Sequence, residues 1–201
     1  LSRMYEATSA IVPVSNEKRH CEFPPVVVHG QLNAWTLEIC HSAMAQCLAK
    51  RATLVICESM LKAKVLANAL YWHYPELAQC TKVYIDSDSV DLADSITRIA
   101  PGEIVISTSL AGRGTDVKTA SIERFGGLHV IVTFLANDLR IEQQVLGRTS
   151  RQGNWGSSQF ILHQPGSDDD NHISRAQLAD LDHLRTDSMQ QSMSSLEAVD
   201  L

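Results

Sequence analysis

The sequence lacks the phosphate-binding loop that a nucleotide hydrolase normally requires. No G-x-x-x-x-G-K-S/T pattern occurs among its 201 residues, and no acidic Walker B strand follows one. Those two motifs supply the lysine and the magnesium ligands of a phosphoryl-transfer site. We therefore expect the chain by itself to be inactive as a nucleotide hydrolase, because it cannot complete such a site alone.

Other absences exclude further classes of protein. The net charge of −6 and the pI near 5.7 argue against a dedicated nucleic-acid-binding surface. The five cysteines form no C-x-x-C pair and no zinc-ligand spacing, so we expect them to be reduced, as in a cytosolic protein. No apolar run is long enough to span a bilayer, and the N-terminus does not have the form of a signal peptide. Because the sequence begins at Leu1, we expect it to be a piece of a longer chain.

The pattern of apolar residues predicts an α/β domain. Continuous apolar runs of buried-strand type alternate with segments of helical periodicity, which indicates a mainly parallel sheet with helices on both faces. We expect an entry arm over 1–25, the α/β domain over 26–165, and an acidic linker with a C-terminal helix or tail over 166–201. The expected strands are 53–57, 82–85, 103–108 (the central one), 128–133 and 157–162, and the expected helices are 32–50, 60–73, 89–100 and 137–149.

One candidate site follows the strand predicted over 103–108. The loop Gly112-Arg113-Gly114-Thr115-Asp116 has glycines that let backbone N–H groups approach a phosphate or a ribose. Asp116 is suited to accept hydrogen bonds from ribose hydroxyls, and Arg113 to pair with a carboxylate or a phosphate. The alternative is an ordinary turn between a strand and a helix, with the aspartate capping the next segment.

A second candidate site closes the helix predicted over 137–149. Gln144, Arg148 and Arg151 are separated by four and three residues, so we expect them to share one helix face. Two guanidinium groups on one face repel each other unless an anion lies between them, and a triphosphate supplies that anion. The alternative is a solvated basic end that the helix dipole favours. Because ligands of parallel sheets bind at the carboxyl ends of the strands, we expect both motifs to face that edge.

In this order, the two motifs resemble motifs V and VI of superfamily-two helicase-like motors, and in particular those of SecA, the preprotein translocase ATPase. The resemblance rests on residues 104–118, on 144–153 running into 156–160, and on the Gly-Gly-Leu-His element within 125–131 that separates SecA from general RNA helicases. Weaker likeness at 3–5 and 53–59 extends it over nearly the whole chain. It implies a RecA-like fold and the second nucleotide-binding domain of a SecA-like motor.

The resemblance also implies roles for individual residues. In that family two RecA-like domains sandwich ATP or ADP with Mg²⁺. Arg148 and Arg151 would reach the phosphates, one of them as the arginine finger, and Gln144 would belong to the network between the domains. The implied nucleotide-binding loop consists of Gly112, Arg113, Gly114, Thr115 and Asp116, with Arg113 supporting the domain interface more than the nucleotide.

The implied partners are the first nucleotide-binding domain of the same full-length chain, an unfolded polypeptide and a membrane channel. The implied location is the cytoplasm, with a peripheral place at the membrane. No metal ligand is expected from this chain itself, and nucleic acid is not an expected partner.

The chain departs from the family's usual pattern at two places. Residues 134–140 lack most of the charges of the Glu-Arg-His-Glu-Ser-Arg-Arg-like run, and Asn154-Trp155-Gly156 stands where the family has Asp-Pro-Gly. Two alternatives therefore remain: a C-terminal domain of an RNA or DNA helicase, and a non-catalytic interaction module that uses Trp155 and residues 134–140. Among other candidates, His129 is expected to be a satisfied strand histidine, Asp168–Asp170 a solvated linker, and Cys57 a residue without a nucleophilic role.

Overall fold

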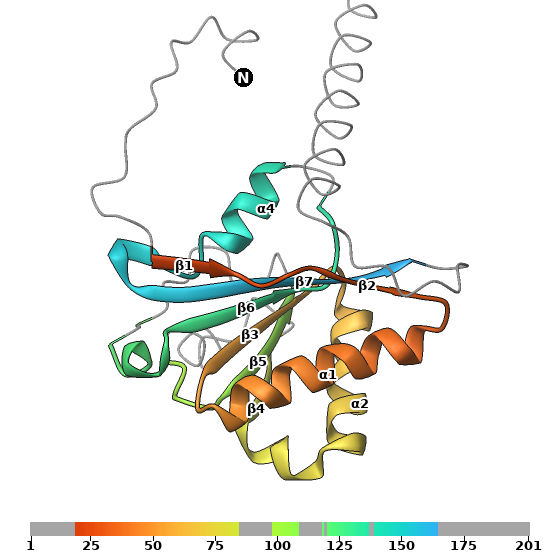
Figure 1. Ribbon diagram of the computed structural model, residues 1–201. Coiled ribbons are helices and arrows are strands. Elements are labelled where there is room, and N and C mark those ends of the chain that lie inside the picture. Colours follow the sequence, from red (N-terminus) through yellow and green to blue (C-terminus); the bar gives the residue numbers. More distant parts are fainter. Residues whose placement is uncertain (1–18, 85–97, 109–117, 119, 137–138, 165–201) are drawn as a thin grey trace, which may run out of the picture.

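The computed structural model describes residues 19–84, 98–108, 118, 120–136 and 139–164 (Figure 1). The strands are β1 (Arg19–Glu22), β2 (Val26–His29), β3 (Ala52–Cys57), β4 (Thr81–Tyr84), β5 (Ile104–Thr108), β6 (Leu128–Val132) and β7 (Trp155–Gln164). The α-helices are α1 (Leu32–Leu48), α2 (Met60–His73) and α4 (Leu139–Leu146), and the 3₁₀ helices are η1 (Pro75–Cys80), η2 (Glu123–Phe125) and η3 (Arg151–Gly153). The helix predicted over 89–100 lies almost entirely outside the described residues.

The strands form one parallel sheet. Its order is β1-β7-β6-β3-β5-β4, with β2 also paired to β7, and every pairing among the described strands is parallel. The prediction of a mainly parallel sheet is therefore confirmed. The prediction that the 103–108 strand is central is wrong, because β5 lies next to the edge strand β4 and β3 is the strand between β5 and β6. Both strands are fully buried and mostly apolar, so their composition does not show which of them is central.

The long strand β7 binds two short strands in succession. β1 pairs with Trp155–Ser158, and β2 pairs with Ile161–Gln164. Pro24 and Pro25 separate the two short strands, which fits the absence of a backbone N–H on proline. Residues 19–22, within the segment expected to be an entry arm, are thus hydrogen-bonded into the sheet, and residues 1–18 lie outside the described part.

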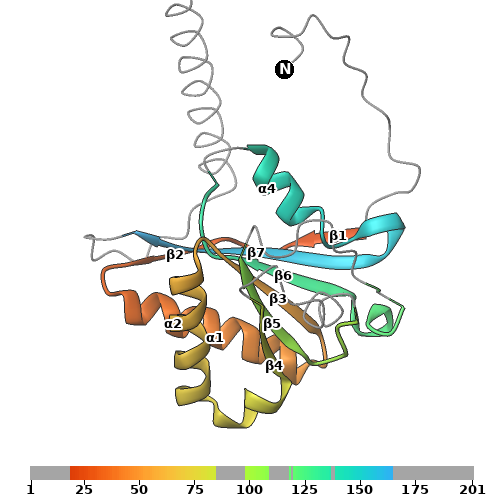
Figure 2. The same cartoon turned by 180° about the vertical axis from the view of Figure 1, so that it is seen from behind.

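Helices α1 and α2 cover one face of the sheet, and α4 lies on the other (Figures 1 and 2). The predicted bounds of α2 are confirmed, and Ser59 caps it by accepting a hydrogen bond from the Lys62 backbone N–H at 3.3 Å. Side chains of β3 alternate between two buried clusters, with Val55 facing α1 and α2 and Leu54 facing away from them. The expectation of helices on both faces is confirmed.

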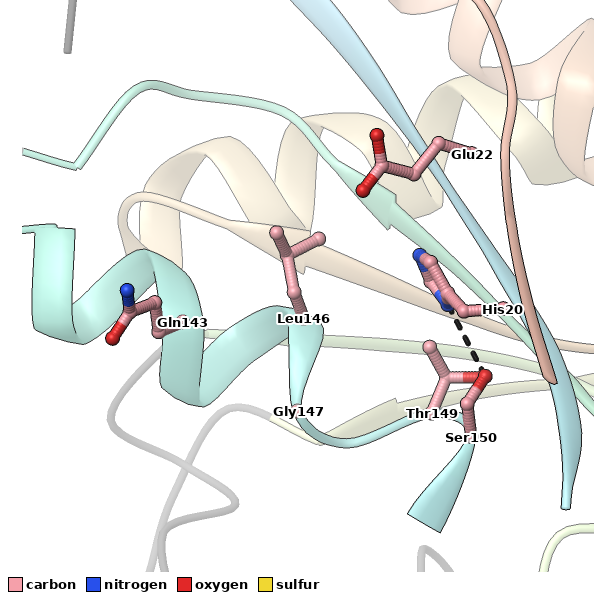
Figure 3. Close-up of a pocket in the computed structure, with 7 residues that line it drawn as sticks. All are labelled: His20, Glu22, Gln143, Leu146, Gly147, Thr149 and Ser150. Carbon is pink, nitrogen blue, oxygen red and sulfur yellow. Dashed lines mark hydrogen bonds between the residues drawn. The ribbon is translucent and has the colours of Figure 1, made fainter. Parts of the chain in front are cut away.

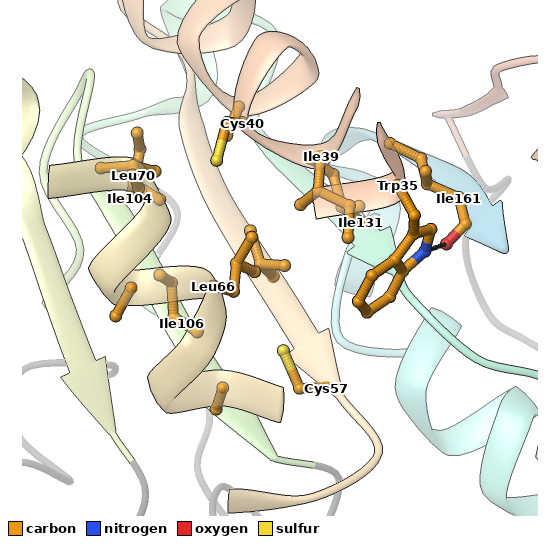
Figure 4. Close-up of a cluster of buried hydrophobic side chains, with 14 of the residues drawn as sticks. Trp35, Ile39, Cys40, Cys57, Leu66, Leu70, Ile104, Ile106, Ile131 and Ile161 are labelled. Atoms are coloured by element: carbon orange, nitrogen blue, oxygen red, sulfur yellow. Dashed lines mark hydrogen bonds between the residues drawn. The ribbon is translucent and has the colours of Figure 1, made fainter. Parts of the chain in front are cut away.

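Trp35 anchors the core beneath α1. Its side chain is 2% exposed, and its indole N–H donates to the Ile161 carbonyl oxygen of β7 at 2.9 Å (Figure 4). Around it lie the apolar residues of the cluster, which include Ile39, Leu66, Leu70, Ile104, Ile106 and Ile131. This cluster fills the space between the sheet and helices α1 and α2, on the side opposite α4.

Candidate functional site

The two candidate motifs differ in what the structure describes. The loop Gly112–Asp116 lies outside the described residues, so its five candidate positions remain sequence-based predictions. Gln144 lies on α4, Arg148 in the turn that follows this helix, and Arg151 at the start of η3. Gln144 and Arg151 are exposed, whereas Arg148 is only 6% exposed.

Helix α4 ends at Leu146, earlier than the predicted end near residue 149. The N–H groups of Arg148 and Thr149 each bond to a carbonyl three residues back, at 3.2 and 3.3 Å, which tightens the last turn away from α-helical geometry. Ser150 then takes the left-handed conformation with φ 56°, which ends the helical path. The prediction that Gln144, Arg148 and Arg151 share one helix face is therefore wrong, because the two arginines follow the helix rather than belong to it.

The turn at 147–150 lies at the amino ends of β6 and β7. The Thr149 hydroxyl donates to the carbonyl oxygen of Leu128, the first residue of β6, at 2.6 Å. Thr149 and Ser150 are both buried there. The expectation that this motif faces the carboxyl ends of the strands is thus wrong, because α4 starts after the carboxyl end of β6 and brings the chain back to the opposite edge.

Two glycines make this close packing possible. A Cβ atom on Gly156 would lie 1.9 Å from the Thr149 hydroxyl oxygen and 2.6 Å from that of Ser150. A Cβ atom on Gly127 would lie 1.7 Å from the Trp155 carbonyl oxygen, and Gly127 also has a φ of +71°. The Gly-Gly-Leu-His element and Gly156 therefore let the turn and the start of β7 lie directly against β6.

A histidine from the first described strand braces the turn. The Nδ1 atom of His20 lies 3.1 Å from the Ser150 hydroxyl oxygen, and its Nε2 atom lies 3.0 Å from that of Ser158 on β7. His20 was not singled out by the sequence analysis. No local signal could have found it, because the contact spans 130 positions and depends on the pairing of β1 with β7.

A pocket of about 520 Å³ opens between β1 and the end of α4 (Figure 3). His20 and Glu22 line it from β1, and the opposite wall comes from α4 and its turn. Its remaining lining residues are Gln143, Leu146, Gly147, Thr149 and Ser150. The lining combines one apolar side chain with hydroxyl, amide, imidazole and carboxylate groups. None of the lining residues is an arginine or a lysine, although the turn that carries Arg148 forms part of the pocket wall.

The side chain of Arg151 is tied to the end of α4. Its Nε–H donates to the Gly147 carbonyl oxygen at 2.7 Å, a position where a cation also interacts favourably with the negative end of the helix dipole. This hydrogen bond orients the guanidinium from the turn while leaving the side chain on the surface. Arg148, by contrast, is buried beneath the surface.

His129 has a structural environment rather than that of a metal ligand. It is fully buried on β6, and its Nδ1 atom lies 2.6 Å from the Ser157 hydroxyl oxygen. Burial lowers the pKa of His129 to about 3, and the charges of Arg51 and His20 act in the same direction. The imidazole is therefore neutral at physiological pH, as expected of a strand histidine, although its Nε2 atom has no hydrogen-bond partner in the described part of the chain. Within those ranges no three histidine, cysteine or acidic side chains gather as a metal site would require.

Trp155, the residue that departs from the family's Asp-Pro-Gly pattern, begins β7. Its side chain is 51% exposed, and its backbone N–H donates to the Glu123 carboxylate at 2.9 Å. A single exposed tryptophan is common on protein surfaces and does not by itself mark an interface. None of the described helices is both long enough and apolar enough to cross a membrane.

Comparisons with known proteins agree with the motifs. The family model described as "SecA P-loop domain" matches residues 118–171, although no phosphate-loop motif occurs in them. The protein translocase subunit SecA of Syntrophus aciditrophicus is 48% identical over 63 residues, which are 31% of this chain and 8% of that protein. SecA 2 of Bordetella avium is 31% identical over 168 residues, 81% of this chain. The chain thus spans less than a quarter of the length of these relatives, since the longer match covers 24% of its protein.

Solved structures show the fold. Domain 2 of the DEAD-box helicase Mss116p, solved bound to an RNA duplex, matches with a TM-score of 0.52 and 13% identity, covering 72% of this chain and 54% of that one. The E. coli DEAD-box protein SrmB, solved with the regulator RraA, matches with a TM-score of 0.51 and 20% identity, covering 70% and 78%. The fold is therefore that of a helicase RecA-like domain. Together with the SecA family model and the SecA relatives, it identifies the chain as a divergent SecA-like sequence.

Proposed function

We propose that this chain acts as the second RecA-like domain of a SecA-like motor, contributing arginines to a nucleotide held by another domain. The observation that carries the proposal is the fixed position of Arg151, whose side chain is exposed while its Nε is held by the Gly147 carbonyl oxygen. A guanidinium that is anchored at one end can reach an anion at low entropic cost. The chain's lack of a phosphate loop makes a separate nucleotide-holding domain necessary.

The two arginines have different environments, and we assign them different roles. Arg151 is the phosphate-contacting residue, the arginine finger, because it lies on the surface. Arg148 is a positioning residue, because a side chain only 6% exposed has little access to a ligand on another domain. Gln144, exposed on α4, belongs to the interface between the two domains.

The donor groups of this region fit a phosphate. Guanidinium and amide groups donate hydrogen bonds, and a guanidinium pairs with phosphate oxygens in bidentate geometry. ATP with Mg²⁺, bound to the other domain, would supply the phosphoryl group whose hydrolysis drives movement. The remaining contacts would come from the loop at 112–116, with Gly112, Gly114 and Thr115 offering backbone N–H groups, Asp116 accepting from the ribose, and Arg113 supporting the domain interface.

The wider partners follow from the same proposal. The relatives carry the name protein translocase subunit, so the movement would be used on an unfolded polypeptide at a membrane channel, from the cytoplasmic side. The likeness to RNA-bound helicase structures is one of fold only, at 13% identity, and the negative charge of the chain does not favour nucleic acid.

The test is ATP hydrolysis by the longest natural chain that contains residues 1–201, compared with its Arg151→Ala variant. Removal of an arginine finger costs roughly 10³–10⁵ in turnover. The matched control is Arg98→Ala, an exposed arginine outside both motifs, which should leave turnover unchanged. Circular dichroism on all three proteins confirms that the fold is intact.

Each outcome of this test decides one part of the proposal. Full turnover in Arg151→Ala would remove the finger role. A natural chain without any hydrolysis would remove the motor role and favour the non-catalytic interaction module. Turnover that rises on addition of single-stranded RNA, with salt-dependent binding, would favour the helicase alternative.

A further inference from the structure

Two cysteines lie side by side on the edge of the domain opposite β1. The Sγ atoms of Cys47, in the last turn of α1, and Cys80, at the end of η1, are 3.7 Å apart although 33 positions separate the residues. Each thiol also has a backbone acceptor: Cys47 donates to the Gly102 carbonyl oxygen at 3.0 Å, and Cys80 to that of Leu77 at 3.2 Å. Both side chains are half-buried, so a small reagent can reach them.

The other three cysteines have different surroundings. Cys40 and Cys57 are fully buried in the core, where burial raises the pKa of their thiols to about 11 and about 12. Cys21 is exposed on β1. β1 and β4 are the first and last strands in the order of the sheet, and β4 begins directly after Cys80. All five are free thiols, so the Cys47–Cys80 contact joins reduced side chains.

We propose that Cys47 and Cys80 form an oxidation site, at which a small disulfide such as oxidised glutathione converts the two thiols into an intramolecular disulfide. One cysteine sulfur attacks the oxidant, which forms a mixed disulfide and releases one glutathione thiol. The second cysteine sulfur then displaces the other glutathione as a thiol. The two cysteine sulfurs are oxidised, the oxidant's disulfide is reduced, and the two thiol protons leave with the two glutathione molecules.

The geometry requires only a small movement for this reaction. A disulfide bond is about 2.05 Å long, so the sulfur atoms must approach each other by less than about 2 Å. Cys47 lies in the last turn of α1 and Cys80 at the end of η1. The thiol-to-Gly102 hydrogen bond is lost in the reaction, because the disulfide has no proton to donate.

Burial limits the rate of the reaction but does not block it. Burial raises the pKa of the Cys47 thiol to about 11, and the hydrogen bond and charge of Cys80 act in the same direction. Because the thiolate is the attacking species, a thiol held in its protonated form reacts slowly at neutral pH. The site is therefore expected to remain reduced under ordinary handling and to respond when an oxidant is supplied in excess.

The product would fasten the end of α1 to the start of β4. The cross-link closes a loop that contains β3 and α2, and closing a loop of this length restricts the unfolded chain. The oxidised protein is expected to melt higher than the reduced protein, by on the order of 10 °C if the bond forms without strain. This inference does not depend on the proposed motor function, since neither cysteine belongs to the turn that carries Arg148 and Arg151 or to the lining of the adjoining pocket.

The experiment uses the 201-residue chain with Cys21→Ser, which removes the exposed thiol. The protein is incubated with excess oxidised glutathione and analysed by intact mass and by non-reducing peptide mapping. The expected product has lost two hydrogen atoms, contains a peptide that joins Cys47 to Cys80, and returns to the starting mass with dithiothreitol. Cys47→Ser and Cys80→Ser, each in the same background, should instead retain one glutathione.

Two results would overturn the proposal. One is recovery of Cys47 and Cys80 as free thiols after prolonged treatment while a control dithiol peptide is fully oxidised. The other is a product that carries two separate glutathiones at these positions, which would show that the sulfurs cannot meet. A melting temperature that rises on oxidation and falls again on reduction, only in the protein that retains both Cys47 and Cys80, would support the proposal independently of mass.

Discussion

The Nδ1 atom of His20 lies 3.1 Å from the hydroxyl oxygen of Ser150, and this contact joins the first described strand to the turn that carries the arginines. The same ring reaches Ser158 on β7 through Nε2 at 3.0 Å. Ser150 is buried with a left-handed backbone, so its conformation is held by contacts rather than by local preference. The position of Arg151, one residue further on, therefore depends on a strand about 130 positions away.

Replacing His20 by alanine should loosen this turn. Two buried serine hydroxyls lose a hydrogen-bond partner, which should lower the free energy of unfolding by about 1–2 kcal/mol. Urea unfolding followed by circular dichroism measures the change. His73→Ala, an exposed histidine at the end of α2, is the matched control and should change stability by less than about 0.5 kcal/mol. Equal losses in both variants would show that His20 is not a specific brace.

Adding a methyl group at Gly156 should be far more costly than its small size suggests. The new Cβ would lie 1.9 Å from the Thr149 hydroxyl oxygen and 2.8 Å from the Ser150 backbone nitrogen, so the turn must move. We expect Gly156→Ala to lower the free energy of unfolding by about 2–4 kcal/mol. Thermal denaturation of the purified variant provides the measurement.

Gly102→Ala separates the effect of space from that of backbone strain. Gly102 has a φ of +79°, but the nearest atom to its added Cβ is 3.5 Å away, in ordinary contact. It should therefore lose only about 1 kcal/mol from the left-handed conformation. If Gly156→Ala proves no more damaging than Gly102→Ala, the close packing of the turn on β7 is not as tight as the structure indicates.

Stability should fall as the pH drops, because His129 must be buried in its neutral form. Its pKa is about 3 in the folded protein against 6.5 for the ordinary side chain, so the unfolded chain binds more protons between these values. The contribution of His129 is fully present above pH of about 6.5 and is lost progressively toward pH of about 3. Over that range we expect a loss of several kcal/mol.

The variant His129→Gln isolates this contribution from that of the acidic residues. Glutamine can still bond to the Ser157 hydroxyl but does not titrate, so its stability should depend less steeply on pH between about 6.5 and 4.5. Urea unfolding of both proteins at a series of pH values gives the two slopes. Parallel curves would mean that His129 is protonated equally in the folded and unfolded states.

Trp35 and Trp72 should respond differently to the same substitution. Trp35→Phe removes the indole N–H that bonds to the Ile161 carbonyl oxygen and leaves a gap in the core, at an expected cost of about 2–3 kcal/mol. Trp72 is 83% exposed, so Trp72→Phe should be within about 0.5 kcal/mol of the parent protein. Guanidinium unfolding compares the two variants, and similar losses in both would contradict the described burial of Trp35.

Much of the fold could be predicted from local sequence. The period of apolar residues predicted α2 with the bounds that are observed. Ser59 lies at the N-cap of this helix, a position that a serine hydroxyl favours because it can accept a hydrogen bond from a free backbone N–H. The mostly apolar runs at β3, β5 and β6 indicated a parallel sheet buried on both faces. These features depend on neighbours within a few residues, so the sequence records them directly.

The order of the strands could not be predicted in the same way. Nothing in the composition of β5 distinguishes it from β3, although only β3 lies between β5 and β6. The incorporation of residues 19–22 as β1 was also missed, since a four-residue strand is stabilised by its partner β7 rather than by its own sequence. Tertiary packing decides which strands become neighbours in the sheet.

The sequence by itself determined the helical and apolar segments, the Gly-Gly-Leu-His element and the spacing of Arg148 and Arg151. Only the tertiary structure decided what that spacing means. The chain leaves the helix at Leu146, Arg148 becomes buried, and Arg151 is held at the surface by the Gly147 carbonyl oxygen. The physical reason is that tertiary contacts hold the turn, from His20 to Ser150 and from Thr149 to the Leu128 carbonyl oxygen, and these contacts outweigh its helical preference.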